Sequence, residues 1–183
     1  MRIISGEFKG RKLQRPPDSI TRPTTDRVRE SVFNILLHLE GFEFDRAVAL
    51  DLFAGSGAMG LEALSRGAAH VTFIDKNPIA RQVILDNVHH LKIQEKAYIC
   101  AQDALELSPA VRPADLVFID PPYSHDLEAK VLEQLVVKGW VRSGAIIVLE
   151  TSKKTKLDFS QTPFSLLTAR TFSNTTVSIL KVD

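Results

Sequence analysis

The sequence of 183 residues contains one cysteine, Cys100, and no long hydrophobic run. A single thiol cannot form an internal disulfide, which excludes a disulfide-stabilised scaffold. Charged residues interrupt every apolar stretch before it reaches the roughly 18 residues of a membrane-spanning helix. The first residues also lack the apolar core and small-residue cleavage site of a secretion signal. We therefore expect a cytoplasmic protein that binds no membrane.

The sequence also lacks an overall excess of charge, since 23 Lys and Arg face 22 Asp and Glu. The distribution is uneven, because residues 1–29 hold eight basic and three acidic side chains, a net +5, which leaves −4 for residues 30–183. Basic side chains displace counterions from phosphates, so this segment suits a polyanionic partner, although a solvated terminus explains the charge equally well. The candidate RNA-contacting residues are Arg2, Lys9, Arg11, Lys12, Arg15, Arg22 and Arg27.

The N-terminal part predicts a hairpin and a helix. We expect a basic hairpin extension over residues 1–23, with strands at 2–5 and 11–14, ahead of one domain over residues 24–183. A helix is predicted from about Thr24 to Gly41. Its expected apolar face consists of Val28, Val32, Ile35, Leu36 and Leu39. Arg27, Arg29 and Glu30 either reach toward a ligand pocket or form ion pairs on the helix surface.

From residue 47 onward, buried strands alternate with helices. The predicted strands are 47–53, 71–75, 98–101, 116–120 and 145–150, and the predicted helices are 58–66, 78–91 and 127–138. Continuous apolar strands separated by helices are typical of a parallel sheet covered on both faces, hence a doubly wound α/β fold. Residues 164–172 and 176–182 leave no room for a helix between them. They predict an antiparallel hairpin at the sheet edge, with Ser173 and Asn174 as its turn.

A glycine-rich loop, residues 54–60, directly follows the first of these strands. Gly55 and Gly57 permit a tight turn close to a ligand, and Gly60 permits close packing of the next helix on the sheet. Taken alone, this pattern is shared by enzymes that bind NAD, FAD and methyl donors.

Acidic residues follow three successive strands, where the carboxyl ends of a parallel sheet form a ligand crevice. Asp51 is placed to bind a methionine amino group, Asp75 a ribose diol, and Asp103 an adenine amino group. A cationic sulfonium tolerates an acid beside the glycine loop, whereas a pyrophosphate does not call for one, so the cofactor predicted is S-adenosylmethionine. Helix or turn capping is the simpler alternative for Asp51 and Asp103. The predicted cofactor-binding residues are Asp51, Phe53, Ala54, Gly55, Gly57, Asp75, Lys76, Asn77, Asp103 and Ala104.

The fourth predicted strand ends in the sequence Asp120-Pro121-Pro122-Tyr123. The lone pair of an exocyclic purine amine is delocalised into the ring, which makes it a poor nucleophile. Hydrogen bonds from that amine to the Asp120 carboxylate and the Pro121 carbonyl would orient it for displacement at the methyl carbon. Tyr123 offers a face for an unstacked base. The predicted catalytic residues are thus 120–123; a rigid loop with a core tyrosine is the structural alternative. The five histidines show no metal-ligand spacing, so no metal site is predicted.

With these pieces in place, the sequence resembles the RsmD family of bacterial 16S ribosomal RNA (guanine-N2)-methyltransferases. The likeness spans nearly the whole chain, in RIISGEFKGRKL, RPTTDRVRESVFNIL, DLFAGSGAMGLEALSRGA and DPPY. It implies a class I methyltransferase fold with a seven-stranded sheet, and a guanine N2 acceptor in the small ribosomal subunit or an assembly intermediate. Tyr123 stands where the family often has phenylalanine, and tyrosine is common in adenine-N6 enzymes.

Other functions stay open at this point. An adenine-N6 methyltransferase acting on RNA or DNA is the nearest alternative, although 183 residues leave no room for a separate DNA-recognition domain. A protein-glutamine methyltransferase would carry asparagine in place of Asp120. A non-catalytic RNA-binding assembly factor would need neither the acids nor DPPY, and DPPY disfavours a nicotinamide oxidoreductase. The sequence leaves open the nucleotide, the oligomeric state, and whether naked RNA or a particle is bound.

Overall fold

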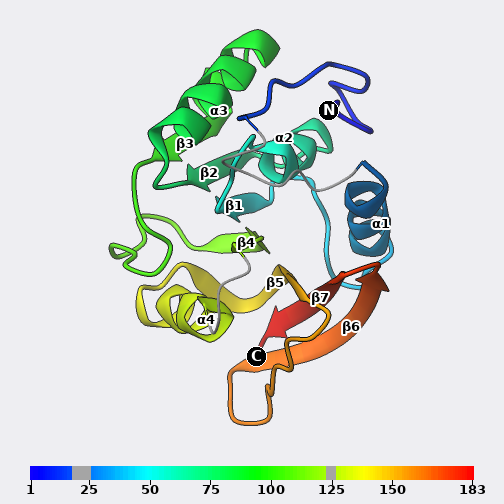
Figure 1. The fold of residues 1–183 in the computed structure, drawn as a ribbon, viewed down its shortest axis with the longest axis vertical. Helices are drawn as coiled ribbons and strands as arrows, with labels where there is room; N and C mark the ends of the chain where they lie inside the picture. Colours follow the sequence, from blue (N-terminus) through cyan, green and yellow to red (C-terminus); the bar gives the residue numbers. More distant parts are fainter. Residues whose placement is uncertain (18–25, 123–126) are drawn as a thin grey trace.

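The computed structural model describes residues 1–17, 26–122 and 127–183, and Figure 1 shows how its elements are arranged. The elements in chain order are α1 (Asp26–Leu37), β1 (Val48–Leu52), α2 (Ala58–Ser65), β2 (His70–Ile74), α3 (Pro78–Leu91), the 3-10 turn η1 (Gln94–Lys96), β3 (Ala97–Cys100), β4 (Ala114–Ile119), α4 (Leu127–Val137), β5 (Val141–Ser152), β6 (Phe164–Phe172) and β7 (Thr175–Val182). No helix among the described residues has the length and hydropathy needed to cross a membrane.

The strands form one seven-stranded sheet in the order β3-β2-β1-β4-β5-β7-β6. The first five are parallel, while β7 runs antiparallel to both β5 and β6. Phe172 pairs with Thr175, so Ser173 and Asn174 make the turn between β6 and β7. The predicted doubly wound sheet with an antiparallel hairpin at its edge is therefore confirmed.

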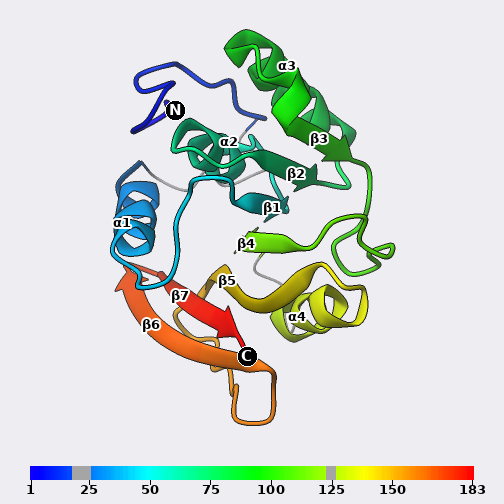
Figure 2. The ribbon, with the colours of Figure 1, turned by 180° about the vertical axis from the view of Figure 1, so that it is seen from behind.

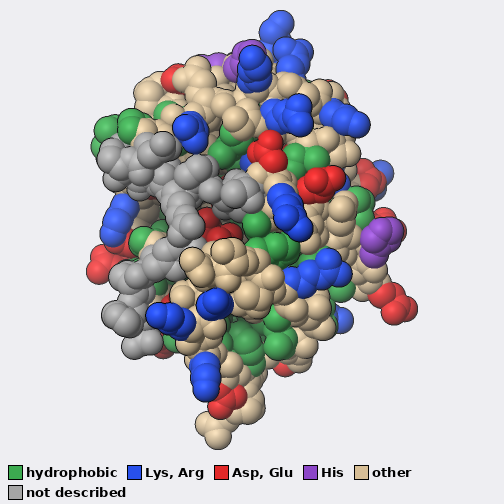
Figure 3. All heavy atoms as spheres, turned by 45° about the vertical axis from the view of Figure 1, so that its right-hand side comes forward, with side chains coloured by type: hydrophobic (Ala, Val, Ile, Leu, Met, Phe, Trp, Pro, Cys, Tyr) green, Lys and Arg blue, Asp and Glu red, His purple; other side chains and the backbone are tan. Residues whose placement is uncertain are grey.

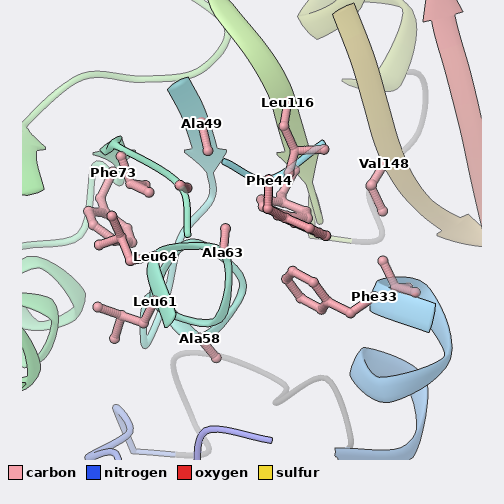
Figure 4. Close-up of a cluster of buried hydrophobic side chains, with 14 of the residues drawn as sticks. Phe33, Phe44, Ala49, Ala58, Leu61, Ala63, Leu64, Phe73, Leu116 and Val148 are labelled. Carbon is pink, nitrogen blue, oxygen red and sulfur yellow. The ribbon is translucent and has the colours of Figure 1, made fainter. Parts of the chain in front are cut away.

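Toward the carboxyl edge, side chains alternate between the two faces of the central strands. On β4, Leu116 and Phe118 face one cluster of buried residues, while Val117 and Ile119 face the other. Helices α1, α2 and α3 cover the first face, and α4 covers the second, as the two opposite views show (Figures 1 and 2). In Figure 4, Phe33 of α1 points toward the sheet and the side chains of α2 fill the space beside it. The strand direction and this alternation fix which side chains reach each face at the carboxyl edge.

Some predicted boundaries were wrong. The N-terminal hairpin forms, since the N–H groups of Ile3, Gly10 and Leu13 donate across its arms to the carbonyls of Arg11, Ile3 and Met1. Its arms are not the two predicted strands, however, and share only one antiparallel bridge, between Arg2 and Lys12. The inward face of α1 is shifted from the expected one: Val32 and Leu36 are buried as predicted, but Phe33 and Arg29 are fully buried as well, while Val28 and Ile35 are only partly so. Strand β5 extends over 141–152, beyond the predicted 145–150. Thr24, named as a helix start, lies outside the described residues.

The N-terminal segment packs against α2 rather than standing apart from it. The buried carboxylate of Glu62 accepts hydrogen bonds from the backbone N–H groups of Ile4, at 2.7 Å, and Ser5, at 3.0 Å. Gly6 adopts φ +82°, and a Cβ there would lie 1.8 Å from the carbonyl oxygen of Ser65. Only glycine fits this approach, so the segment is held against α2 by backbone contacts.

Arg29 provides a second anchor for the same segment. Its side chain is fully buried, and its Nη2 donates to the Arg2 carbonyl oxygen and to Asp26. Burial lowers the pKa of Arg29, an effect that the nearby charges of Asp26 and Glu62 oppose. Arg29 therefore forms the expected ion pair within α1, with Asp26 at 3.0 Å, but it is buried rather than on the helix surface, and it does not line the cleft described below.

Candidate active site

A cleft of about 770 Å³ opens at the carboxyl edge of the parallel strands. It is bordered by the ends of β1, β2, β4 and β5, the segment after β3, the turn between β6 and β7, and parts of the N-terminal segment and α1. Its lining includes nine of the ten predicted cofactor residues, all except Gly57. It also includes Asp120, Pro121 and Pro122, whereas Tyr123 lies outside the described residues.

The glycine loop turns sharply between β1 and α2. Gly55 has φ +55° and Gly57 has φ +75°, and Phe53 adopts a positive φ of 56° although it carries a side chain. A Cβ on Gly60 would lie 2.4 Å from the ring of Phe73. Glycine is therefore needed at this position for α2 to pack closely on β2. The roles predicted for the glycines in turning and packing thus match the geometry, and Gly57 serves the turn without lining the cleft.

Asp75 braces this loop from the end of β2. Its Oδ2 accepts the N–H of Gly55 at 2.9 Å, and its Oδ1 accepts the N–H of Asn77 at 2.8 Å. Each carboxylate oxygen has two lone pairs, so both oxygens keep acceptor capacity toward the cleft. The Asn77 side chain caps α3 by accepting the N–H of Ile79 at 2.9 Å. These bonds hold Asp75 in a fixed orientation.

Asp51 is the most deeply buried acid of the cleft, with 3% of its surface exposed. Its Oδ2 accepts the N–H of Gly60 at 2.9 Å, in the first turn of α2. Burial raises the pKa of Asp51 to about 8; the charges of Asp120 and Asp75 add to this rise, and the Gly60 N–H opposes it. The capping alternative therefore holds for one oxygen, while the residue also lines the cleft.

Asp103 follows β3 and pairs with Lys76, whose Nζ lies 3.1 Å from Oδ2. Its Oδ1 accepts the N–H of Leu105 at 3.1 Å, and this bond, with Lys76, lowers the pKa of Asp103. Asp103 is thus ionised, and it ends the row of acids on the β3 side of the cleft. The neighbouring Ala104 is buried and also lines the cleft.

Asp120 and Pro121 lie one strand away on the other side of β1. Ile119, the residue before Asp120, pairs with Leu52 on β1 and with Leu149 on β5. The alternation on β4 places Asp120 on the same face as Phe118, and Phe118 pairs with Asp51. The acid of the DPPY motif therefore faces the same cleft as Asp51, and the charge of Asp120 contributes to the raised pKa of Asp51.

Sequence reasoning missed the far half of the cleft. Glu150 lies near the carboxyl end of β5, and residues 171–175, the turn between β6 and β7 with the strand ends beside it, complete that wall. Gln102, Val28 and Ser56 also line the cleft without having been predicted. The rule that found the other acids, an acidic residue where a parallel strand ends at the carboxyl edge, applies equally to Glu150.

The predicted RNA-contacting residues divide into two groups. Arg15 and Arg27 line the cleft, whereas Arg2, Lys9, Arg11 and Lys12 are exposed outside it. Arg22 lies outside the described residues. Basic and acidic side chains are interspersed on the face drawn in Figure 3, so the charge there is mixed rather than one continuous positive patch. Among the described residues, no three His, Cys, Asp or Glu side chains gather as a metal site.

The sheet order, the antiparallel β7 and the cleft at the carboxyl edge define a class I S-adenosylmethionine-dependent methyltransferase. A family model described as conserved hypothetical protein 95 matches residues 1–181. The chain belongs to this family, the RsmD family of S-adenosylmethionine-dependent RNA methyltransferases.

Three relatives illustrate the likeness. YlbH of Bacillus subtilis is 35% identical over 99% of this chain and 98% of its own length. Ribosomal RNA small subunit methyltransferase D of Escherichia coli is 39% identical over 82% of this chain and 74% of its own length. The solved structure of yhhF from Escherichia coli superposes with a TM-score of 0.84 at 34% identity, covering 100% of this chain and 98% of that one.

Proposed function

We propose that this chain transfers the methyl group of S-adenosylmethionine to the exocyclic N2 of a guanine in 16S ribosomal RNA, within the small subunit or an assembly intermediate in the cytoplasm. The observation that carries the proposal is that Asp120, Pro121 and Pro122 lie next to Asp51. All four residues line the cleft that the glycine loop also borders. The name of the Escherichia coli relative supports small-subunit ribosomal RNA as the substrate.

The side chains of the cleft fit the cofactor. Its ammonium group, ribose hydroxyls and adenine amino group all donate hydrogen bonds, and the acids at the ends of β1, β2 and β3 all accept them. We assign the ammonium group to Asp51, the ribose to Asp75, and the adenine amino group to Asp103. The cofactor half of the cleft is the part at the ends of β1, β2 and β3. The other residues that line it are Phe53, Ala54, Gly55, Lys76, Asn77 and Ala104, and Gly57 shapes the loop. The bound cofactor supplies an electrophilic methyl group.

The chain activates the acceptor. Asp120 and the Pro121 carbonyl accept hydrogen bonds from the guanine N2 amino group, which turns its lone pair out of conjugation with the ring. Pro122 stiffens the loop because proline fixes φ. As the new N–C bond forms, the bond from the methyl carbon to sulfur would break and S-adenosylhomocysteine would leave. The amino group loses one proton, which Asp120 accepts. Tyr123 is proposed to stack on the base.

One incubation tests the proposal. The purified chain, methyl-labelled S-adenosylmethionine and small ribosomal subunits from a strain that lacks this protein are combined, and the RNA is digested to nucleosides. Label in N2-methylguanosine is the expected result. Label in N6-methyladenosine would overturn the base assignment, and RNA binding without any transfer would support a non-catalytic assembly factor. Naked RNA, tested in parallel, identifies the substrate form.

A further inference from the structure

We infer that Glu150 is a base-specificity residue that selects guanine by accepting its N1–H beside Asp120. This inference rests on the proposed function and deepens it, because it names the group that reads the edge of the acceptor base. It concerns the half of the cleft on β5 and β7, which the cofactor assignments leave unused.

The register of the sheet places Glu150 and Asp120 side by side. Ile119 pairs with Leu149, and the two acids are the next residues on these neighbouring parallel strands. Parallel strands lie about 4.8 Å apart. Phe118 and Val148, each two residues earlier, face the same buried cluster, so alternation points both acids to that face. Both side chains line the cleft.

The position of Glu150 along the sheet excludes it from the cofactor half. The strand order from β3 to β7 places Asp103, Asp75 and Asp51 on the first three strands, then Asp120 and finally Glu150. Glu150 is therefore two strands beyond Asp51, on the far side of Asp120. Buried Thr175 on β7 and half-buried Phe172 on β6 border the same space. We therefore place the next edge atom of a base held by Asp120 toward β5, where Glu150 lies.

The hydrogen-bonding groups on the edge of a purine explain how two neighbouring carboxylates would select guanine. In guanine, N1–H and the N2 amino group are adjacent donors, so two neighbouring carboxylates match both of them. In adenine, the atom next to the N6 amino group is N1, a bare acceptor, which a carboxylate repels. A site that hydrogen-bonds one substrate group rejects an analogue that lacks it. Glu150 has one methylene more than Asp120, which gives it the reach to the second atom.

The test uses the RNA fragment that the chain methylates, made with guanine, or with 2,6-diaminopurine, at the target position. The analogue keeps the 2-amino group but presents N1 as an acceptor. For guanine RNA, we expect Glu150→Gln to lower kcat/KM about tenfold to a hundredfold, the range for loss of one charge-assisted hydrogen bond. The same variant should gain activity on 2,6-diaminopurine RNA, because the glutamine amide can donate to N1. Glu150→Ala should lose guanine activity without that gain.

Two controls separate a specificity role from a loss of cofactor binding or of folding. Affinity for S-adenosylhomocysteine should stay within a few-fold in both variants, and their thermal unfolding should match that of the wild type. Wild-type discrimination between the two bases in Glu150→Gln would overturn the inference. If the wild type makes no N2-methylguanosine on any RNA, the proposed function itself fails, which is a different outcome.

Discussion

Asn87 on α3 and Gln14 in the N-terminal segment exchange a reciprocal pair of hydrogen bonds. The N–H of Gln14 donates to Asn87 Oδ1 at 2.8 Å, and Asn87 Nδ2 donates to the Gln14 carbonyl at 3.0 Å. The same Nδ2 donates to the carbonyl of Ser56 in the glycine loop at 3.0 Å. One buried amide therefore joins the basic segment, next to Arg15, to the loop that borders the cofactor half.

Replacement of this amide should weaken both connections. Asn87→Ala leaves backbone groups of Gln14 and Ser56 without their partner, and a buried group left unsatisfied costs about 1–3 kcal/mol. We expect a loss of this size in denaturant unfolding, together with weaker binding of S-adenosylhomocysteine. Asn34→Ala, on the exposed side of α1, is the matched control and should change neither quantity. Wild-type stability in Asn87→Ala would show that these bonds are dispensable.

The Asp120 carboxylate is expected to act on the acceptor and not on the cofactor. Asp120→Ala should abolish methyl transfer while S-adenosylhomocysteine affinity stays within a few-fold. Asp120→Asn keeps a carbonyl oxygen that accepts one amine hydrogen bond, so it should retain part of the activity. Calorimetry and nucleoside analysis on the same preparations check both quantities. Equal loss of binding and transfer in the alanine variant would mean that Asp120 belongs to the cofactor half.

The raised pKa of Asp51 predicts how the free protein responds to pH. The carboxyl titrates near 8 in the fold, against an ordinary value of 3.8, so the fold favours the protonated form. Its contribution to stability is therefore complete below about pH 4 and is lost as pH rises toward 8. Asp51→Asn keeps an acceptor for the Gly60 N–H and cannot ionise. Its stability relative to the wild type should rise between pH 4 and 8 and then level off. A pH-independent difference in unfolding free energy would contradict the raised pKa.

The parallel core of the fold was predictable because its signals are local. Apolar runs, the glycine loop and Pro78 at the start of α3 each fixed an element within a few residues. The N-terminal hairpin forms, but its arms are not regular strands, and Ile4 and Ser5 donate instead to Glu62, 58 and 57 residues away, which no local pattern indicates. The ion pair of Arg29 with Asp26 was predictable, but its burial was not, because its second partner, the carbonyl of Arg2, lies outside the helix.

The candidate site was predictable only as far as each strand end was inspected. Acids after the first four strands were recognised, and all of them line the cleft. Glu150 also ends its predicted strand, 145–150, so the same rule would have found it. In the structure, β5 pairs antiparallel with β7 and continues to Ser152. The turn between β6 and β7 lines the cleft because β7 pairs antiparallel with β5. No local sequence pattern indicates which strands pair at the sheet edge.

The exposed basic residues of the N-terminal segment give the last prediction. Lys9, Arg11 and Lys12 are exposed and lie on a segment held against α2, so their charges are presented from a fixed surface. Reversing all three to glutamate should weaken binding to small-subunit RNA. Because each lost phosphate contact lowers the slope of log affinity against log salt by about 0.7–0.9, the slope should fall by roughly 2–3.

A charge reversal at another surface separates contact from general repulsion in this experiment. Lys96 and Arg112 are exposed and precede β3 and β4, at the sheet edge opposite the cleft. Reversing these two to glutamate adds negative charge far from the proposed RNA path, so the salt slope should stay near that of the wild type. Filter binding at several salt concentrations measures all three proteins. An equal decrease per charge in both variants would assign the effect to net charge, and the N-terminal segment would then be a solvated surface rather than an RNA contact.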